Sequence, residues 1–190
     1  MSLDSPRERG PRLLPGDIGP ASSFEEDFRA CYTARFPALF RYLDRLTGDP
    51  DLASDIAQEA FTRLHRRGAM PDEPAAWLVV VANNMLRDER RRASRRLRLL
   101  ADERSREPSA TPSSGPEADL ERAEQVRAVR AALDSVSARD RQALLLRHSG
   151  YSYREIAVAL HLAETSVGTT LVRAAQAFRR AFKEMHGAPE

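Results

Sequence analysis

The chain has 190 residues, which suits one or two small domains and is too short for a large enzyme with a single core. Charged residues make up 31% of it, and no apolar run reaches the roughly 18–20 residues that cross a membrane or forms the core of a signal peptide. The single cysteine, Cys31, excludes an internal disulfide framework and a zinc site with several cysteines. We therefore expect a cytoplasmic protein with no membrane insertion.

The net charge is only +2, but the charges are unevenly distributed. Residues 87–98 contain seven arginines and two acids, whereas residues 49–59 contain four acids and no base. Separate patches of opposite charge indicate two different partners.

The N-terminal part predicts a tail followed by a long helix. Residues 1–23 contain four prolines and three glycines, and we expect them to be disordered. Apolar residues then recur at helical spacing from Phe24 onward. Pro37 lies inside this run and should kink the helix or start a new one, because proline cannot donate to the helical ladder.

Two more helices are expected before a linker. Asp49 followed by Pro50 is a helix-start signal, with Asp as N-cap and Pro at the first helical position. This helix should end near residue 67. A third helix begins near Pro74, with an apolar first half that must be core and a strongly basic second half. Residues 102–119 are rich in Pro, Ser and acidic residues, which is typical of a linker.

The C-terminal part predicts four helices. One lies near 120–134, two open at the capping signatures that begin with Ser137 and Ser152, and the last lies near 164–185. The short helix, the three-residue turn and the final helix have the geometry of a helix-turn-helix, although an ordinary helical hairpin is the alternative.

The predicted fold is all-α, with two small helical domains joined by a flexible linker and a helix-turn-helix in the second domain. The expected boundaries are 1–23 for the tail, 24–100 for the first domain, 101–120 for the linker and 121–186 for the second domain.

Motifs on both sides of the linker resemble bacterial RNA polymerase sigma factors, most closely the small extracytoplasmic-function group. Gly150-Tyr151-Ser152-Tyr153-x-Glu155-Ile156-Ala157, within a longer pattern from Leu133 to Ala174, resembles the domain that reads the −35 promoter element. Asp55-Ile56-x-Gln58-Glu59-x-Phe61 resembles the helix that docks on the polymerase clamp. Trp77-Leu78…Asn84…Asp88-x-x-Arg91-Arg92 resembles the part that melts and reads the −10 element.

The resemblance implies a factor that binds core RNA polymerase and directs promoter-specific initiation of transcription. It implies no catalysis by this chain, since the polymerase supplies the chemistry, and no cofactor. An anti-sigma partner is common in the family, although no residue here demands one. The four histidines have no metal-like spacing, and nothing resembles a nucleophile–base pair or a phosphate-binding loop.

Acidic residues on the second helix are the candidate polymerase contacts. Asp51, Asp55 and Glu59 recur at i, i+4 and i+8 and so lie on one helix face, with Gln58 beside them. Carboxylates arranged this way without His or Cys companions favour a docking surface over a metal or acid–base site. The resemblance assigns this surface to a basic coiled coil of the largest polymerase subunit.

The basic third helix carries the candidate −10 contacts. Arginines can follow phosphates, and asparagine amides can read base edges. The candidate residues are Asn83, Asn84, Arg87, Arg90, Arg91, Arg92 and Arg95. Trp77 could stack on a base, but its place in an apolar run favours core packing.

The candidate −35 contacts lie on the last helix: Glu164, Thr165, Ser166, Gly168, Thr169, Val172 and Arg173. The family often has a Ser cap where this chain has Ala163, and a Lys or Arg followed by Ser where it has Gly168-Thr169. We therefore expect base contacts through short hydroxyl side chains and a weak intrinsic affinity for the −35 element.

The alternative function is an autonomous helix-turn-helix repressor or activator. Such a protein would need a dimer interface and two half-sites about 34 Å apart. The chain shows one DNA-reading element and no coiled-coil heptads, which favours the initiation factor.

Overall fold

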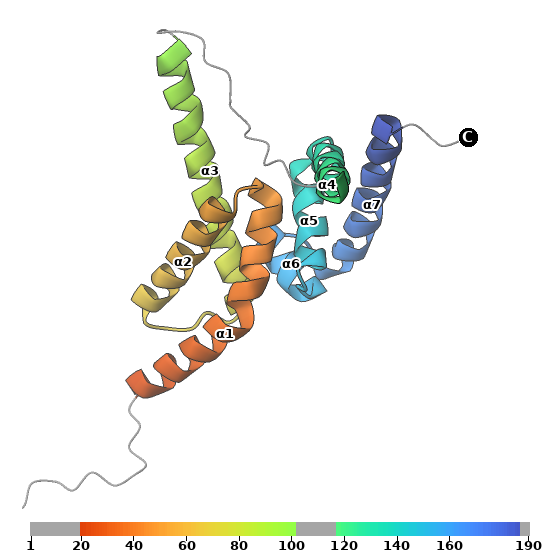
Figure 1. Cartoon of the computed structure of the whole chain (residues 1–190). Helices are drawn as coiled ribbons and strands as arrows, with labels where there is room; N and C mark the ends of the chain where they lie inside the picture. Colours follow the sequence, from red (N-terminus) through yellow and green to blue (C-terminus); the bar gives the residue numbers. More distant parts are fainter. Residues whose placement is uncertain (1–19, 102–116, 187–190) are drawn as a thin grey trace, which may run out of the picture.

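The computed structural model describes residues 20–101 and 117–186, where every element is an α-helix and no strand is present (Figure 1). The helices are α1 (Pro20–Thr47), α2 (Pro50–Arg67), α3 (Pro74–Ala101), α4 (Glu117–Asp134), α5 (Ala138–His148), α6 (Tyr153–Leu160) and α7 (Glu164–His186). The all-α prediction is confirmed. Most of the expected tail and linker, residues 1–19 and 102–116, lies outside the described residues. The flanking helices begin earlier than the sequence suggested, α1 at Pro20 and α4 at Glu117.

The N-terminal unit consists of α1, α2 and α3. Pro37 lies inside α1, which continues through it but changes direction near its middle (Figure 1), as expected for a proline in a helix interior. The predicted start of α2 is confirmed, because the Asp49 side chain accepts hydrogen bonds from the backbone N–H groups of Asp51 and Leu52, both at 3.0 Å. Gly68 ends α2 in the left-handed conformation, with φ of 67°.

The C-terminal unit consists of α4 to α7, and both predicted capping signatures are confirmed. The Ser137 hydroxyl accepts from the Asp140 N–H, and Ser152 and Glu155 form a reciprocal capping box at the start of α6. A tight turn at His161 connects α6 to α7 as in a helix-turn-helix, and His161 adopts a left-handed φ of 53°.

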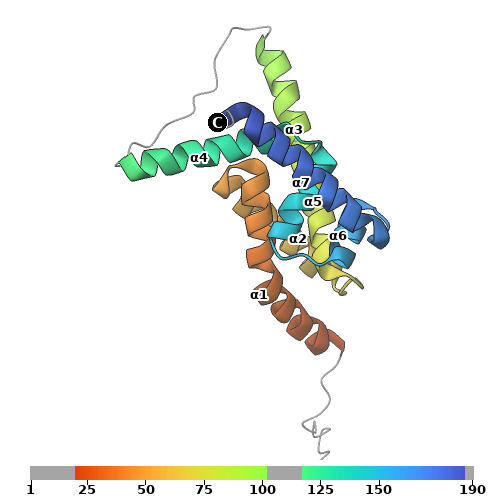
Figure 2. The same cartoon turned by 90° about the vertical axis from the view of Figure 1, so that its right-hand side faces the viewer.

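The two units pack against each other, which the sequence did not predict. Helix α5 contacts α1, and α6 contacts α3. The buried apolar residues of both units form one continuous core that includes Leu39 and Val79 from the first unit and Leu146 and Ile156 from the second. Figure 2, viewed from the side, shows α5, α6 and α7 against the N-terminal unit, while α4 projects outward. The candidate −10 residues of α3 and the candidate −35 residues of α7 therefore belong to helices that share one packed core.

The start of α7 offers a test of the capping analysis. Ala163 precedes α7 and has no side-chain acceptor for the first N–H groups of that helix. Ala163→Ser should raise the free energy of unfolding by about 0.5–2 kcal/mol, and Ser152→Ala should lower it by a similar amount. Urea denaturation followed by circular dichroism measures both. A destabilised Ala163→Ser variant would contradict the assignment of Ala163 as an uncapped N-cap.

Candidate polymerase and nucleic-acid interfaces

Helix α2 has one apolar face and one acidic face. Its buried residues are Ala53, Ile56, Ala57, Ala60, Phe61 and Leu64. On the opposite side Asp51, Asp55 and Gln58 are exposed, and among the described residues neither aspartate forms an ion pair. Glu59 is half-buried, and its Oε1 lies 2.9 Å from Arg63 Nε. The structure thus leaves two carboxylates of the predicted stripe free for another molecule.

In the part of the chain that the structure describes, the carboxylates of α2 are spread along one helix face rather than clustered. No group of three or more His, Cys, Asp or Glu side chains there could hold a metal ion. The spacing along one helix directs the carboxylates outward rather than toward a common point. This arrangement suits recognition of an extended basic surface.

The second half of α3 presents its arginines to solvent. Every residue from Arg87 to Arg96 is exposed. Two arginines lie near acidic side chains one turn away. Arg91 Nη1 is 3.9 Å from Asp88 Oδ1, and Arg92 Nη1 is 3.6 Å from Glu89 Oε2. Such exposed pairs contribute little stability and are easily exchanged for other anions. The predicted arginines therefore form an accessible cationic track.

The two asparagines of α3 lie in different surroundings. Asn84 is exposed, and its Oδ1 accepts a hydrogen bond from Arg87 Nη1 at 3.2 Å. Asn83 is half-buried, and its Oδ1 accepts from the Tyr42 hydroxyl at 2.8 Å. Tyr42 is fully buried, and this burial raises the pKa of its hydroxyl. The contact between Tyr42 and Asn83 could not be predicted from the sequence, because the two residues are 41 positions apart.

Trp77 packs against the core at the start of α3, as the sequence predicted. It is half-buried, and the guanidinium carbon of Arg67 lies 5.9 Å from its ring centroid.

The first half of α7 exposes most of the predicted −35 residues. Glu164, Thr165, Thr169, Val172 and Arg173 are exposed, and Ser166 and Gly168 are partly buried. Val172, with 59% of its surface accessible, is the most exposed of the large apolar residues in the described part of the chain. A methyl group added at Gly168 would lie 3.7 Å from the Tyr153 ring, which is an ordinary contact, so a side chain fits there.

Arg173 already has a partner inside the chain. Its Nη2 lies 2.6 Å from Oδ1 of Asp140, which is buried at the start of α5. The hydrogen bond from Arg173 lowers the pKa of Asp140, and the Ser137 contact acts in the same direction. The helix-turn-helix is thus fastened to α5 through a residue predicted to touch DNA.

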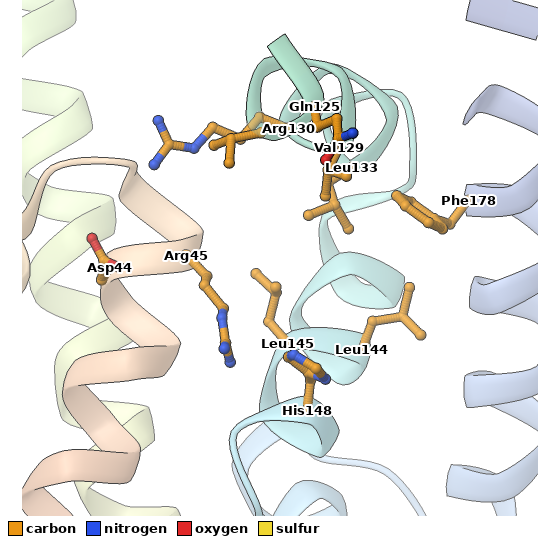
Figure 3. Close-up of a pocket in the computed structure, with 11 residues that line it drawn as sticks. Asp44, Arg45, Gln125, Val129, Arg130, Leu133, Leu144, Leu145, His148 and Phe178 are labelled. Carbon is orange, nitrogen blue, oxygen red and sulfur yellow. The ribbon is translucent and has the colours of Figure 1, made fainter. Parts of the chain in front are cut away.

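A groove that the sequence does not predict lies where α1, α4, α5 and α7 meet (Figure 3). Its volume is about 790 Å³. Apolar side chains from three helices, including Val129, Leu144 and Phe178, line it, and Asp44, Arg45 and Arg130 add charge. No periodic pattern in the sequence could show that side chains from both units share one groove.

Known proteins resemble this chain along most of its length. The family profile described as Sigma-70 region 2 matches residues 31–96, and the profile described as Sigma-70, region 4 matches residues 126–178. The ECF RNA polymerase sigma factor SigL of Mycobacterium tuberculosis is 34% identical over 173 residues, covering 88% of this chain and 95% of that protein. The ECF sigma factor SigE of Mycolicibacterium smegmatis is 30% identical over 145 residues, covering 74% and 56% respectively.

A solved structure supports the same fold. The sigma factor RpoE of Bartonella quintana, in complex with the anti-sigma factor NepR, superposes with a TM-score of 0.58 at 22% identity and covers 87% of this chain and 99% of that one. Among the described residues no helix has the length and hydropathy to cross a membrane. With both sigma regions present in order and a full-length relative, the chain belongs to the ECF family of RNA polymerase sigma factors, which are initiation factors rather than enzymes, and it directs promoter-specific initiation of transcription by core RNA polymerase.

Proposed function

We propose that three surfaces of this protein have separate binding roles in transcription initiation. The acidic face of α2 (Asp51, Asp55, Gln58 and Glu59) docks on core polymerase. The basic half of α3, with Asn83 and Asn84, engages the −10 element, and the first half of α7 reads the −35 element. The observation that carries this proposal is the free acidic face of α2 behind a buried apolar face. The chain supplies position and specificity and performs no catalysis itself.

The α3 surface suits a strand that has separated from its duplex. Its arginines donate hydrogen bonds in a fixed fork that matches phosphate oxygens. Asn84 and Asn83 lie on the first part of this surface, next to the arginine track. Phosphate contacts would position the strand and the amides would contact base edges, which is the usual division between affinity and specificity.

The α7 surface suits weak, direct reading of a duplex. Its exposed threonines are short, and the Thr169 hydroxyl donates to the Ser166 carbonyl at 3.0 Å, which reduces its freedom to reach DNA. Val172 can contact a thymine methyl group. The Arg173–Asp140 pair leaves this surface with little uncommitted positive charge. These features support the expected weak −35 affinity.

We further propose a cytoplasmic location, where polymerase and promoter DNA are found, and a regulatory partner of the anti-sigma type, as NepR is for its sigma factor. The groove between α1, α4, α5 and α7 supports the proposed regulatory partner, because a partner helix seated there would touch both units at once.

A two-hybrid screen of the source genome tests the groove as the binding site of this partner. The screen should yield a protein that binds the wild type and not the Val129→Asp variant. If every interacting protein bound the wild type and the Val129→Asp variant equally, the groove would not be the binding site of the regulatory partner.

Reversing one charge on α2 tests the polymerase surface. Asp55→Arg should reduce core-dependent abortive transcription at least tenfold, because it places a cation against the basic partner surface. The matched control is Glu184→Arg, an equal charge change at an exposed position on α7. Both variants should keep the wild-type circular dichroism spectrum, since neither side chain is buried.

Unchanged initiation by Asp55→Arg would refute the polymerase surface. If the wild-type protein initiated nothing with core polymerase and bound duplex DNA tightly alone, the autonomous regulator would be the better explanation.

Removing arginines from α3 tests the phosphate track. Arg90→Ala with Arg95→Ala should lower the slope of log affinity against log salt by about 1.4, because each phosphate contact to single-stranded DNA contributes about 0.7. Binding of the polymerase holoenzyme to a −10 oligonucleotide across a salt series measures it. The double variant Arg29→Ala/Arg66→Ala removes the same charge from exposed positions elsewhere and should leave the slope unchanged.

A cation at Gly168 tests the orientation of α7. Gly168→Arg should tighten binding to nonspecific duplex and steepen the salt slope by about 0.9, because one phosphate contact is added. Gly168→Ala controls for the gain in helix propensity of about 1 kcal/mol. If the Arg and Ala variants bind duplex equally, position 168 does not face DNA.

A further inference from the structure

The groove where α1, α4, α5 and α7 meet has an apolar wall that solvent reaches. Its volume of about 790 Å³ lies within the range of small-molecule sites, about 300–1,000 Å³. Val126 and Val129 of α4 line it and keep 45% and 39% of their surfaces accessible. Single exposed apolar side chains are ordinary, but a contiguous apolar patch that lines a groove indicates a binding site.

The other helices complete the apolar lining. Leu144 and Leu145 of α5 form one side of the groove, and Leu133 of α4 adds to the side that carries the two valines. Phe178 of α7 points from the third side toward α4 and α5 (Figure 3). A hydrocarbon chain between these helices would be removed from water along much of its length, which is the main source of affinity in an apolar site.

The end of the groove next to α1 carries positive charge without a counter-charge. The Arg45 side chain is half-buried, and its Nη1 atom is buried with no hydrogen-bond partner among the described protein atoms. Figure 3 shows the Arg45 guanidinium pointing toward α5, whereas the Asp44 carboxylate points to the other side of α1. The guanidinium of Arg130 adds a second cation, beside Gly48 just after α1.

An unpaired buried guanidinium nitrogen indicates the chemistry of a ligand. A buried donor without an acceptor costs free energy, and an anionic oxygen placed against it would recover that cost. Hydrogen bonds between a guanidinium and a carboxylate are among the strong ones in proteins, because both groups are charged. The cationic end of the groove therefore favours an anionic head group, and the apolar walls favour a hydrocarbon chain.

We propose that the groove binds a small amphipathic carboxylate of the fatty-acid class, with its carboxylate on Arg45 and its hydrocarbon chain between α4, α5 and α7. The carboxylate would accept a hydrogen bond from Arg45 Nη1, and Arg130 would add attraction at longer range. The chain would cover Val126 and Val129. A neutral chain would leave the guanidinium unpaired, and a short anion would leave the valines uncovered, so the two features together specify the amphiphile.

This ligand would also affect the regulatory partner proposed for the same groove. The hydrocarbon chain would cover Val129 and its apolar neighbours, so the ligand and the partner would compete. A small molecule could in this way release the sigma factor from its regulator. That consequence rests on the proposed partner, whereas ligand binding itself does not.

Titration of the free full-length protein with decanoate tests the proposal. Isothermal titration calorimetry, at concentrations too low for micelles, should show one saturable site. Octanoate should bind about fifteenfold more weakly, because each of its two missing methylenes contributes about fourfold, the equivalent of about 0.8 kcal/mol. Decanol, which has the same chain without the charge, should bind at least tenfold more weakly than decanoate. Absence of saturable binding, or equal binding of decanoate and decanol, would overturn the proposal.

Substitutions in the groove test where each part of the ligand lies. Arg45→Met keeps an apolar side chain of similar length and removes the charge, so it should weaken decanoate binding at least tenfold and leave decanol binding within twofold. The matched control is Arg66→Met, the same charge change at an exposed position on α2, which should alter neither affinity. Equal weakening by Arg45→Met and Arg66→Met would refute the site, because decanoate would then respond only to overall charge.

A second variant keeps the test valid if Arg45→Met perturbs folding. Val129→Asp puts a carboxylate into the apolar wall at an exposed position, and it should abolish decanoate binding without changing the circular dichroism spectrum. Decanoate binding that is unchanged in Val129→Asp would also overturn the proposal.

The titration is independent of the proposed polymerase, promoter and regulator contacts. The free protein needs none of these partners to bind decanoate, so failure to bind rejects the ligand site alone. Loss or retention of initiation by Asp55→Arg bears on the proposed function alone.

Discussion

A buried carboxylate must find partners for its charge, and the structure depends on how Glu155 meets that requirement. One oxygen accepts from the Ser152 N–H at 2.7 Å and completes the cap of α6, while the other lies against Arg35 of the opposite unit. The same side chain thus starts the first helix of the helix-turn-helix and places it on α1. Local folding and the packing of the two units are coupled through this one residue.

The N-terminal unit keeps its two charged surfaces from neutralising each other. The acids of α2 and the arginines of α3 belong to neighbouring helices whose apolar faces share a core. The second half of α3, which carries the arginines, extends well beyond that core and away from α2 (Figure 1). A small unit can in this way offer an acidic surface to one macromolecule and a basic surface to another.

The sequence predicted what depends on near neighbours. The caps at Asp49, Ser137 and Ser152, the stripe on α2 and the helix-turn-helix all follow from spacings of a few residues. It did not predict contacts between distant residues: Arg41 meets the Ser149 carbonyl across 108 positions, and Arg173 meets Asp140 across 33. Charge pattern shows that a side chain is available for binding, but only packing shows whether another part of the chain already holds it.

The solvent-exposed half of α3 has a consequence for the thermodynamics of binding. From Arg87 to Arg96 the helix has no buried side chain, so its own backbone ladder and one-turn ion pairs hold it together. Short helices without tertiary packing are marginal in water, and such segments open locally at low cost. A DNA strand that bound to the second half of α3 would therefore have to order the helix as well as neutralise the charges of its arginines. For the proposed −10 contact, part of the electrostatic attraction would be offset by lost conformational entropy, which would make that contact easier to release when the polymerase leaves the promoter.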